Sequence, residues 1–307
     1  MAKRYIHINE ISKSFGIRRI LDGCSIEINA GSVFGLVGRN GSGKTTLIRI
    51  VLGLLKQDAG NVTVLDCIPW QHEESLYGRV GVVLENDGFS PNMTVRENLA
   101  FFAGAKNKTW PEVEAYLNEF WKETFIYDEV HHGRRTVKFL SRGQKMQCGI
   151  CRAFLGRPDI LVLDEPTVAL DVDAYDHVCG LIRYARQRGA AVLISSHQLS
   201  AIEELCDVVG VLHNKHLQIV SMQASGSDGQ EWIIVADNVP AYGTIIEQYT
   251  GTGPAYRDNA WHIIVSMPDT DVPELLRLLI NAGCGIREVK PIPIPLKEHL
   301  RAYYEKN

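Results

Sequence analysis

The opening stretch of the chain combines strand-like and helix-like patterns of apolar residues. Residues 5–11 and 24–29 alternate apolar and polar positions, as half-buried strands do, and residues 17–23 between them are expected to form a turn region. Residues 33–38 (VFGLVG) form a short apolar run that ends in glycine, and a helical pattern follows at 45–55. These patterns predict an antiparallel sheet followed by a strand, a glycine loop and a helix.

A helical insert is expected to interrupt the strands. Apolar residues recur at helical spacing over residues 93–104 and again over 111–125, where Pro111 suits the first turn of a helix. We place this insert at about residues 86–155.

Strands buried on both faces are expected after the insert. Residues 160–164 (ILVLD) and 191–196 (AVLISS) are continuous apolar runs, typical of a parallel sheet covered on both sides. Residues 173–188 between them have a helical pattern. The order strand, helix, strand predicts an α/β core.

The pattern changes at residues 221–230 (SMQASGSDGQ), a polar stretch rich in Ser and Gly that we interpret as a domain boundary. The domains would then be residues 1–220 and 221–307. The second part shows strand patterns at 231–236, 260–267 and 286–290, helical patterns at 240–249 and 273–282, and a closing helical pattern at 295–307. These elements predict a small α+β domain, in which we find no chemical motif.

Composition and charge narrow the class of protein. Apolar residues make up 45% of the chain and charged residues 22%, which is ordinary for a globular protein. The formal net charge of −4 lacks the basic excess of a protein held by nucleic-acid phosphates, so no nucleic-acid partner is expected. No stretch approaches the ~18 apolar residues of a membrane span, and the first residues lack the apolar core of a signal peptide. We expect the chain to fold in the cytoplasm.

Seven cysteines are scattered along the sequence without regular spacing, which argues against a secreted disulfide framework. Cys148 and Cys151 form a CxxC pair, which could indicate redox or metal chemistry. No second pair lies nearby and both residues fall in a helical pattern, so buried structural residues are the favoured interpretation.

The strongest chemical signal lies between the apolar run at 33–38 and the helix that follows. Gly38 to Thr45 (GRNGSGKT) satisfy the phosphate-binding pattern G-x-x-x-x-G-K-[ST] in the expected strand–loop–helix setting. Glycines let the backbone wrap a phosphate, Lys44 neutralises its charge, and the Thr45 hydroxyl suits Mg²⁺. The candidate ATP-binding residues here are Gly38, Asn40, Gly41, Ser42, Gly43, Lys44, Thr45 and Thr46.

Two adjacent carboxylates end the apolar run at 160–164. Asp164 at the strand end suits the shell of a Mg²⁺ ion, and Glu165 suits a base that orients and polarises the attacking water. The alternative interpretation is a solvated acidic pair without a chemical role. The presence of a phosphate-binding loop in the same chain makes this alternative the weaker one.

Further motifs resemble those of ABC (ATP-binding cassette) transporter ATPases. Leu140 to Gln144 (LSRGQ) is similar to the family's LSGGQ signature and stands shortly before LVLDEPT, as in the family. Asp171 resembles the D-loop aspartate, His197 the switch histidine, and Phe15 the aromatic residue that stacks on adenine. Together the matches cover about residues 3–220.

This resemblance implies a mixed-sheet P-loop NTPase fold with an antiparallel subdomain and an ATP site divided between two cassettes. One cassette would supply the P-loop, and the other would present Ser141, Gly143 and Gln144 at a helix N-terminus. The implied ligands are ATP and Mg²⁺. The implied partners are a second copy or a second cassette, and a separate integral membrane permease at the inner face of the cell membrane.

The sequence departs from the family pattern at two positions. Glu85 stands where the family has the Q-loop glutamine, and a carboxylate there could still reach Mg²⁺. Arg142 replaces a small residue of the signature, and its guanidinium could face the partner's nucleotide or point to solvent. Glu85 and the run after it resemble the bacitracin-resistance and lantibiotic-immunity branch of exporters, and the SRG sequence at 141–143 resembles multidrug-type relatives of the same branch.

Two other functions compete with an exporter subunit. A soluble ABC ATPase acting on ribosomes or DNA is disfavoured by the single cassette and the acidic charge balance. A P-loop kinase would make the ordered motifs at Ser141, Asp171 and His197 a coincidence. For the second domain, stabilising or regulating a homodimer and simply covering a sheet edge stay equally open.

Overall fold

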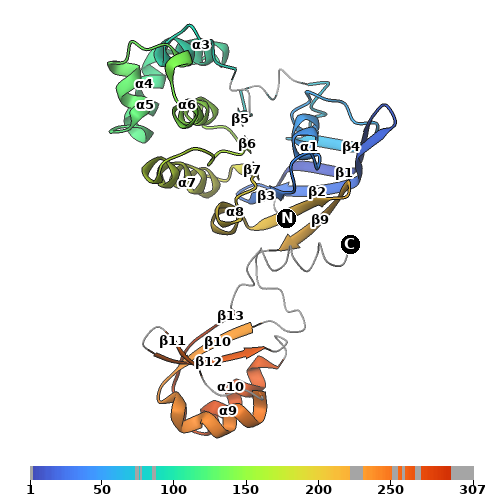
Figure 1. Cartoon of the computed structure of the whole chain (residues 1–307), viewed down its shortest axis with the longest axis vertical. Coiled ribbons are helices and arrows are strands. Elements are labelled where there is room, and N and C mark those ends of the chain that lie inside the picture. Colours follow the sequence, from blue (N-terminus) through green and yellow to red (C-terminus); the bar gives the residue numbers. More distant parts are fainter. Residues whose placement is uncertain are drawn as a thin grey trace. The chain divides into compact units, whose positions relative to one another are not determined.

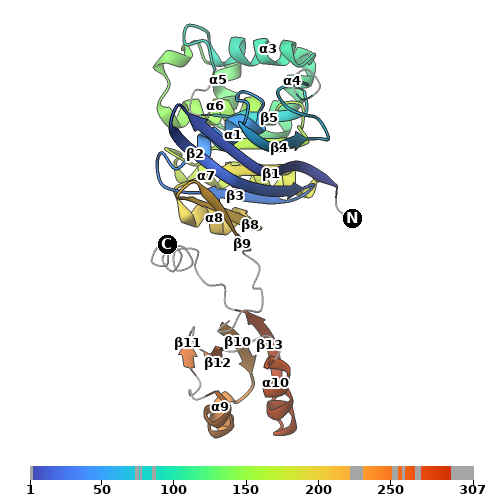
Figure 2. The same ribbon diagram turned by 90° about the vertical axis from the view of Figure 1, so that its right-hand side faces the viewer.

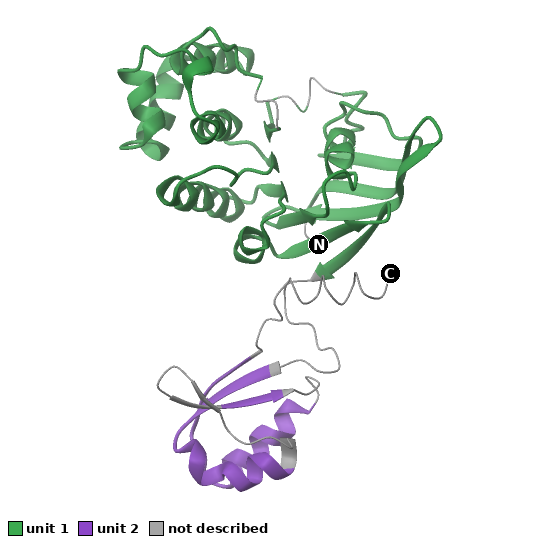
Figure 3. Ribbon diagram, in the orientation of Figure 1, with its two compact units in different colours: residues 1–220 green, residues 221–307 purple. Residues whose placement is uncertain are grey.

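The computed structural model describes residues 3–72, 76, 78–84, 88–221, 231–250, 255–257, 260–266 and 271–291. The chain forms two compact units, Met1–Val220 and Ser221–Asn307, which are coloured separately in Figure 3. Each unit has its own hydrophobic core.

The first unit opens with a three-stranded antiparallel sheet in the order β2–β1–β4. Its strands are β1 (Arg4–Phe15), β2 (Arg18–Asn29) and β4 (Ala59–Val64). The expected turn region at 17–23 is wrong, because β2 already begins at Arg18. Several register shifts along the β1–β2 pair disturb the alternation of buried and exposed residues, and so hide the longer strands in the sequence.

The central sheet of the first unit has six strands, and five of them run parallel. In spatial order they are β5 (Val80–Val83), β6 (Ile160–Asp164), β7 (Ala191–Ser195), β3 (Val33–Val37), β8 (Val208–His213) and β9 (His216–Ser221). Every residue of β3, β6 and β7 is buried. This confirms the expected α/β core and the mixed sheets.

Helices cover both faces of this sheet. α1 (Lys44–Val51) packs between the central sheet and the three-stranded sheet (Figure 1). α6 (Arg142–Phe154), α7 (Val172–Gln187) and α8 (Leu199–Leu205) cover the opposite face, as the views in Figures 1 and 2 show. The strands between these layers are therefore shielded from water.

The helical insert comprises α3 (Val95–Ala105), α4 (Trp110–Phe120), α5 (Phe125–His131) and a short 3-10 helix at Val137–Phe139, and α6 continues from it. Pro111 lies in the first turn of α4, as predicted. The single helix expected over 111–125 is wrong: α4 ends at Phe120, and Thr124 caps a new helix by accepting a hydrogen bond from the Tyr127 amide.

The second unit is a four-stranded antiparallel sheet with two helices packed on one face (Figure 1). Its elements are β10 (Glu231–Ala236), the 3-10 helix Val239–Tyr242, α9 (Gly243–Thr250), β11 (Ala255–Arg257), β12 (Ala260–Ser266), α10 (Val272–Asn281) and β13 (Ile286–Pro291). The order β11–β12–β10–β13 with a βαββαβ sequence is the ferredoxin-like arrangement. The closing helix expected at 295–307 lies outside the described residues.

Among the helices of the described residues, none is both long and apolar enough to cross a membrane.

Candidate functional site

The topology of the central sheet brings the predicted chemical groups to one edge. Parallel strands present their carboxyl ends on the same side, where α/β proteins bind ligands. The P-loop follows β3, Asp164 ends β6, and Ser195 ends β7, which lies between those two strands. Groups far apart in sequence therefore meet beside the start of α1.

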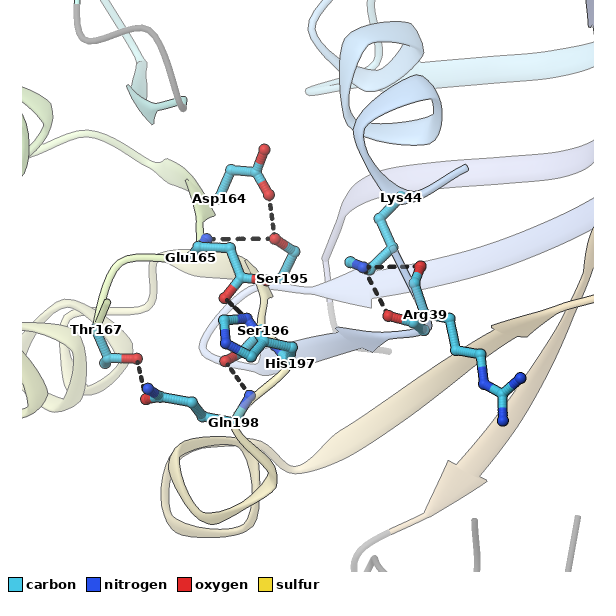
Figure 4. Close-up of polar contacts among 10 residues, drawn as sticks. Arg39, Lys44, Asp164, Glu165, Thr167, Ser195, Ser196, His197 and Gln198 are labelled. Atoms are coloured by element: carbon cyan, nitrogen blue, oxygen red, sulfur yellow. Dashed lines mark hydrogen bonds and ion pairs between the residues drawn. The ribbon is translucent and has the colours of Figure 1, made fainter. Parts of the chain in front are cut away.

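The P-loop holds a buried cation. Gly43 has φ of 114°, a left-handed conformation that favours glycine, and it directly precedes α1. Lys44 is only 8% exposed, and its Nζ donates hydrogen bonds to the carbonyl oxygens of Gly38 (2.7 Å) and Arg39 (3.4 Å), as Figure 4 shows. Carbonyl oxygens of the loop thus accept the hydrogen bonds that the ammonium group of Lys44 would donate to a bound phosphate.

Asp164 and Glu165 are held by a buried serine of the next strand. The Ser195 hydroxyl donates to the Asp164 carboxylate and accepts a 3.3 Å hydrogen bond from the Glu165 amide. That amide also lies 3.0 Å from the Ser195 carbonyl oxygen. Glu165 adopts φ of 53°, an uncommon conformation for a non-glycine residue that only such surrounding contacts maintain.

His197 faces Glu165 across the edge of the sheet. Its Nδ1 lies 2.8 Å from Glu165 Oε2, and its backbone amide donates to the same oxygen at 3.3 Å (Figure 4). The ring and the backbone amide of His197 therefore both contact one carboxylate oxygen of Glu165, which leaves the other for a water molecule.

The signature segment forms the capped start of α6. Ser141 is the N-cap: its side chain accepts from the Gln144 amide, and the Gln144 side chain accepts from the Ser141 amide. A Cβ atom at Gly143 would lie 2.1 Å from the carbonyl oxygen of Ala169. Glycine at this position therefore lets the first turn of α6 touch the loop that follows Glu165.

Asp171 has a structural role in the same loop. Its Oδ1 accepts a 2.9 Å hydrogen bond from the Ala174 amide and caps α7. Ala169, two residues earlier, has φ of 62°. The loop from Glu165 to Asp171 thus links the carboxylate pair to the start of α6 and to α7.

A cavity of about 890 Å³ joins the P-loop to the carboxylates. That volume is within the range of small-molecule sites. Its lining residues are Phe15, Arg18, Ile20, Asn40, Gly41, Gly43, Lys44, Thr45, Thr46, Val83, Leu84, Arg142, Lys145, Met146, Gly149, Asp164, Glu165, Val168 and His197.

Comparison with known proteins decides the family. The profile described as ABC transporter matches residues 21–168. The uncharacterized ABC transporter ATP-binding protein YdbJ of Bacillus subtilis is 34% identical over 306 residues, which cover 97% of this chain and 94% of that protein. This chain belongs to the ABC transporter ATP-binding proteins. The cassette is therefore an ATP-binding transporter subunit with the ATPase activity of the family.

Two relatives with a named cargo match about 70% of the chain. The bacitracin transport ATP-binding protein BcrA of Bacillus licheniformis is 34% identical over 220 residues, covering 69% of this chain and 68% of that protein. The Nod factor export ATP-binding protein I of Bradyrhizobium diazoefficiens is 35% identical over 217 residues, covering 70% and 69%. These matches confirm the predicted family branch.

Solved structures share the fold of the cassette. An ATP-binding subunit of an ABC transporter aligns with a TM-score of 0.64 at 24% identity, over 71% of this chain and 90% of that one. A nucleotide-free ATP-binding cassette aligns with a TM-score of 0.59 at 28% identity, over 71% and 91%. The predicted ABC-type P-loop fold is confirmed.

The cassette gathers only part of the predicted site around its cavity. The lining includes Phe15, the P-loop residues from Asn40 to Thr46 except Ser42, both carboxylates and His197. Predicted residues outside the lining are Gly38, Ser42, Ser141, Gly143, Gln144 and Asp171. Glu85 lies outside the described residues.

Several residues around the cavity were missed by the sequence reasoning. Ser195, which positions both carboxylates, ends the same strand that leads to His197, so that link was available in the sequence. Arg18 and Lys145 line the cavity but belong to no motif. They give no sequence signal because only the folded chain brings β2 and α6 to the P-loop.

Cys148 and Cys151 are buried in α6, in keeping with the structural interpretation. Burial raises the pKa of the Cys151 thiol well above its usual range. A thiolate, the reactive form of cysteine, is therefore disfavoured there.

Proposed function

We propose that the cassette is the energising subunit of an exporter, and that MgATP closes it against a second copy or a second cassette beneath a separate membrane permease. Each closed pair would hold two ATP molecules between the P-loop of one chain and the signature of the other. Hydrolysis would remove the γ-phosphate contacts that hold the pair together. The role of BcrA in bacitracin transport and of the related protein in Nod factor export supports this proposal.

One observation carries the two-chain proposal. Ser141 caps α6, and the amide groups of the first turn of this helix, including that of Gly143, suit a phosphate, yet neither Ser141 nor Gly143 lines the cavity of its own chain. Ser141 is exposed. A helix N-terminus in this position is available to a nucleotide held by another chain.

The residues that line the cavity suit ATP hydrolysis. Glu165 would accept a proton from the water that attacks the γ-phosphate, and His197 would keep the Glu165 carboxylate in place. Lys44 would exchange its carbonyl partners for phosphate oxygens. Phe15, which is half exposed at the end of β1, would stack on adenine.

The same wall offers ligands for a magnesium ion. The Thr45 hydroxyl and the Asp164 carboxylate both line the cavity, and oxygen donors of this kind are the ones that Mg²⁺ prefers. Bound Mg²⁺ would neutralise charge on the phosphates during transfer. Ser195 would hold the Asp164 carboxylate toward this position through the hydroxyl hydrogen bond.

The permease would dock on the helical insert, which would keep the cassette at the inner face of the membrane. A second cavity, of about 330 Å³, lies between the central sheet and the insert and is lined mainly by apolar residues. Leu54 at its wall is 62% exposed, and Phe101 on α3 is 65% exposed. Exposed apolar surface of this kind marks contact sites for other proteins. Leu54→Asp should therefore prevent recovery of a membrane protein with the tagged chain from solubilised membranes.

The direct test of the two-chain site is the ATPase rate as a function of protein concentration. Specific activity should rise with concentration and then level off, because only the pair is active. Glu165→Gln should abolish hydrolysis at every concentration. A specific activity that does not depend on concentration, in a protein that stays monomeric, would overturn the proposal.

A further inference from the structure

A third cavity of the cassette, of about 650 Å³, lies beside the P-loop but outside the nucleotide site. It is bounded by residues 17–20 at the start of β2, by residues 39–42 of the P-loop and by residues 213–215 after β8. Because β8 pairs with β3, the turn that follows β8 lies next to the loop that follows β3. In Figure 4 the side chain of Arg39 points away from Asp164 and Glu165.

The groups assigned to ATP chemistry belong to the other cavity. Lys44, Asp164, Glu165 and His197 line the nucleotide cavity and do not line this one. The two cavities share a wall, to which Asn40 of the P-loop contributes. A ligand of the third cavity would therefore bind beside ATP and not in its place.

Basic side chains give this cavity its character. Those that line it are Arg18, Arg19, Arg39, His213 and Lys215. Among the described residues, no acidic side chain lines it, although Asp22 nearby pairs with Arg19 at 2.9 Å. In the same part of the chain, neither Arg18 nor Lys215 forms an ion pair. Like charges gathered in one cavity repel each other, and a bound anion removes that repulsion.

The backbone holds one of these cations in a conformation that disfavours lysine. Asn214 and Lys215 form the two-residue turn between β8 and β9, with φ of 47° and 75°. Two positive φ values define a type I′ turn, in which glycine is preferred at the second position. A lysine there costs free energy that glycine would not, and strain of this kind is typical of functional positions.

A buried hydroxyl adds a hydrogen-bond donor to the same cavity. Ser42 lines the third cavity and does not line the nucleotide cavity. Within the part of the chain that the structure describes, its buried Oγ has no hydrogen-bond partner. A buried polar group without a partner is unfavourable, and an oxygen of a bound anion would accept this hydrogen bond.

We propose that the third cavity binds an anion with two or more phosphate groups while the P-loop holds its own nucleotide. Guanidinium groups bind two oxygens of one phosphate, and an ammonium group adds a point charge. The volume lies within the range of small-molecule sites, so an anion larger than one phosphate fits. A free oligophosphate and a second nucleotide share this chemistry. All the residues named for the site belong to one chain, so it does not depend on pairing.

Calorimetric titration of the full chain with sodium tripolyphosphate, in the presence of saturating ADP, tests the site. We expect one tripolyphosphate to bind per chain, with an affinity that falls as salt is added. Binding should persist in Lys44→Met, because Lys44 does not line this cavity. Titration with ADP alone distinguishes the two sources: a second equivalent of ADP per chain identifies a nucleotide site, and a single equivalent identifies an oligophosphate site.

Lys215→Gly separates binding from folding. Loss of the ammonium group should weaken tripolyphosphate binding about 10-fold, since a charged hydrogen bond is lost. The same change relieves the backbone, so the midpoint of thermal unfolding without anion should rise by about 2–4 °C. Asn214→Gly is the matched control: it changes the same turn and the same cavity without changing charge, and should keep the wild-type affinity.

Three results would overturn the proposal. The first is no binding of tripolyphosphate at low salt when ADP fills the P-loop. The second is loss of binding in Lys44→Met, which would place the anion in the P-loop itself. The third is a stabilised Lys215→Gly that binds tripolyphosphate as tightly as the wild type. None of these results bears on the two-chain ATP site, which is tested separately by the ATPase rate.

Discussion

The contact between Gly143 and Ala169 can be tested by adding a single methyl group. In Gly143→Ala the new Cβ would lie 2.1 Å from the Ala169 carbonyl oxygen. Carbon and oxygen atoms approach no closer than about 3.3 Å even in favourable contacts. The start of α6 and the loop after Glu165 must therefore separate by about 1 Å.

The expected effect on turnover follows from that displacement. The start of α6 carries the signature, and the loop continues from Glu165, so both partners in the contact belong to the proposed site. A misplacement of about 1 Å can lower a rate about 100-fold. Folding should survive, because overpacking costs about 1–3 kcal/mol and alanine is favoured over glycine in a helix by about 1 kcal/mol.

The assay is steady-state ATP hydrolysis at saturating MgATP, with circular dichroism to verify folding. Gly180→Ala is the matched control, because Gly180 lies in α7 and an added Cβ would meet nothing within 4 Å. The control should keep its activity and gain stability. We expect Gly143→Ala to lose about 100-fold in kcat and to bind nucleotide normally through its P-loop. Normal turnover by folded Gly143→Ala, or an equal loss in the control, would refute the reasoning.

Three further predictions concern charged or titrating side chains. Lys44→Met should keep the fold, since methionine is apolar and can fill most of the space of the buried lysine, and weaken ATP binding about 10- to 100-fold in a fluorescence titration; normal affinity would contradict its phosphate role. His197→Ala should lower kcat and leave ATP affinity unchanged, because the ring contacts Glu165 at 2.8 Å; a change in affinity alone would argue against it. Burial, with Arg152 nearby, lowers the pKa of Lys106 to about 8, so the folded state loses its proton before the unfolded state does. Lys106→Met should therefore have a larger free energy of unfolding than the wild type at pH 7. In urea unfolding this difference should shrink between pH 8 and 10, and a difference independent of pH would contradict the prediction.

The strands and helices that frame the P-loop could be predicted because their patterns are local. The runs at 33–38, 160–164 and 191–196 are apolar up to the polar residues that end the last two, since helices cover both faces of the sheet. The extent of β2 could not be predicted, because its register shifts depend on pairing with β1. The break between α4 and α5 depends on one capping threonine inside a continuous helical pattern.

The site shows the same division between local and long-range information. The P-loop and the carboxylate pair follow from motifs of a few residues, since the chemistry constrains neighbouring positions. The Ser195 hydrogen bonds and the left-handed backbone of Glu165 arise from two strands that are distant in sequence. The placement of Arg142 on the cavity wall likewise required the fold, because the signature alone left its direction open.

The central claim is that ATP joins two chains through sites to which both contribute. Sedimentation velocity of Glu165→Gln with ATP, with ADP and without nucleotide tests it most directly. We predict a dimer that forms only with ATP and contains one ATP per chain, while Ser141→Ala in the same background stays monomeric. A monomer saturated with ATP, or a dimer that forms equally well without nucleotide, would contradict the account.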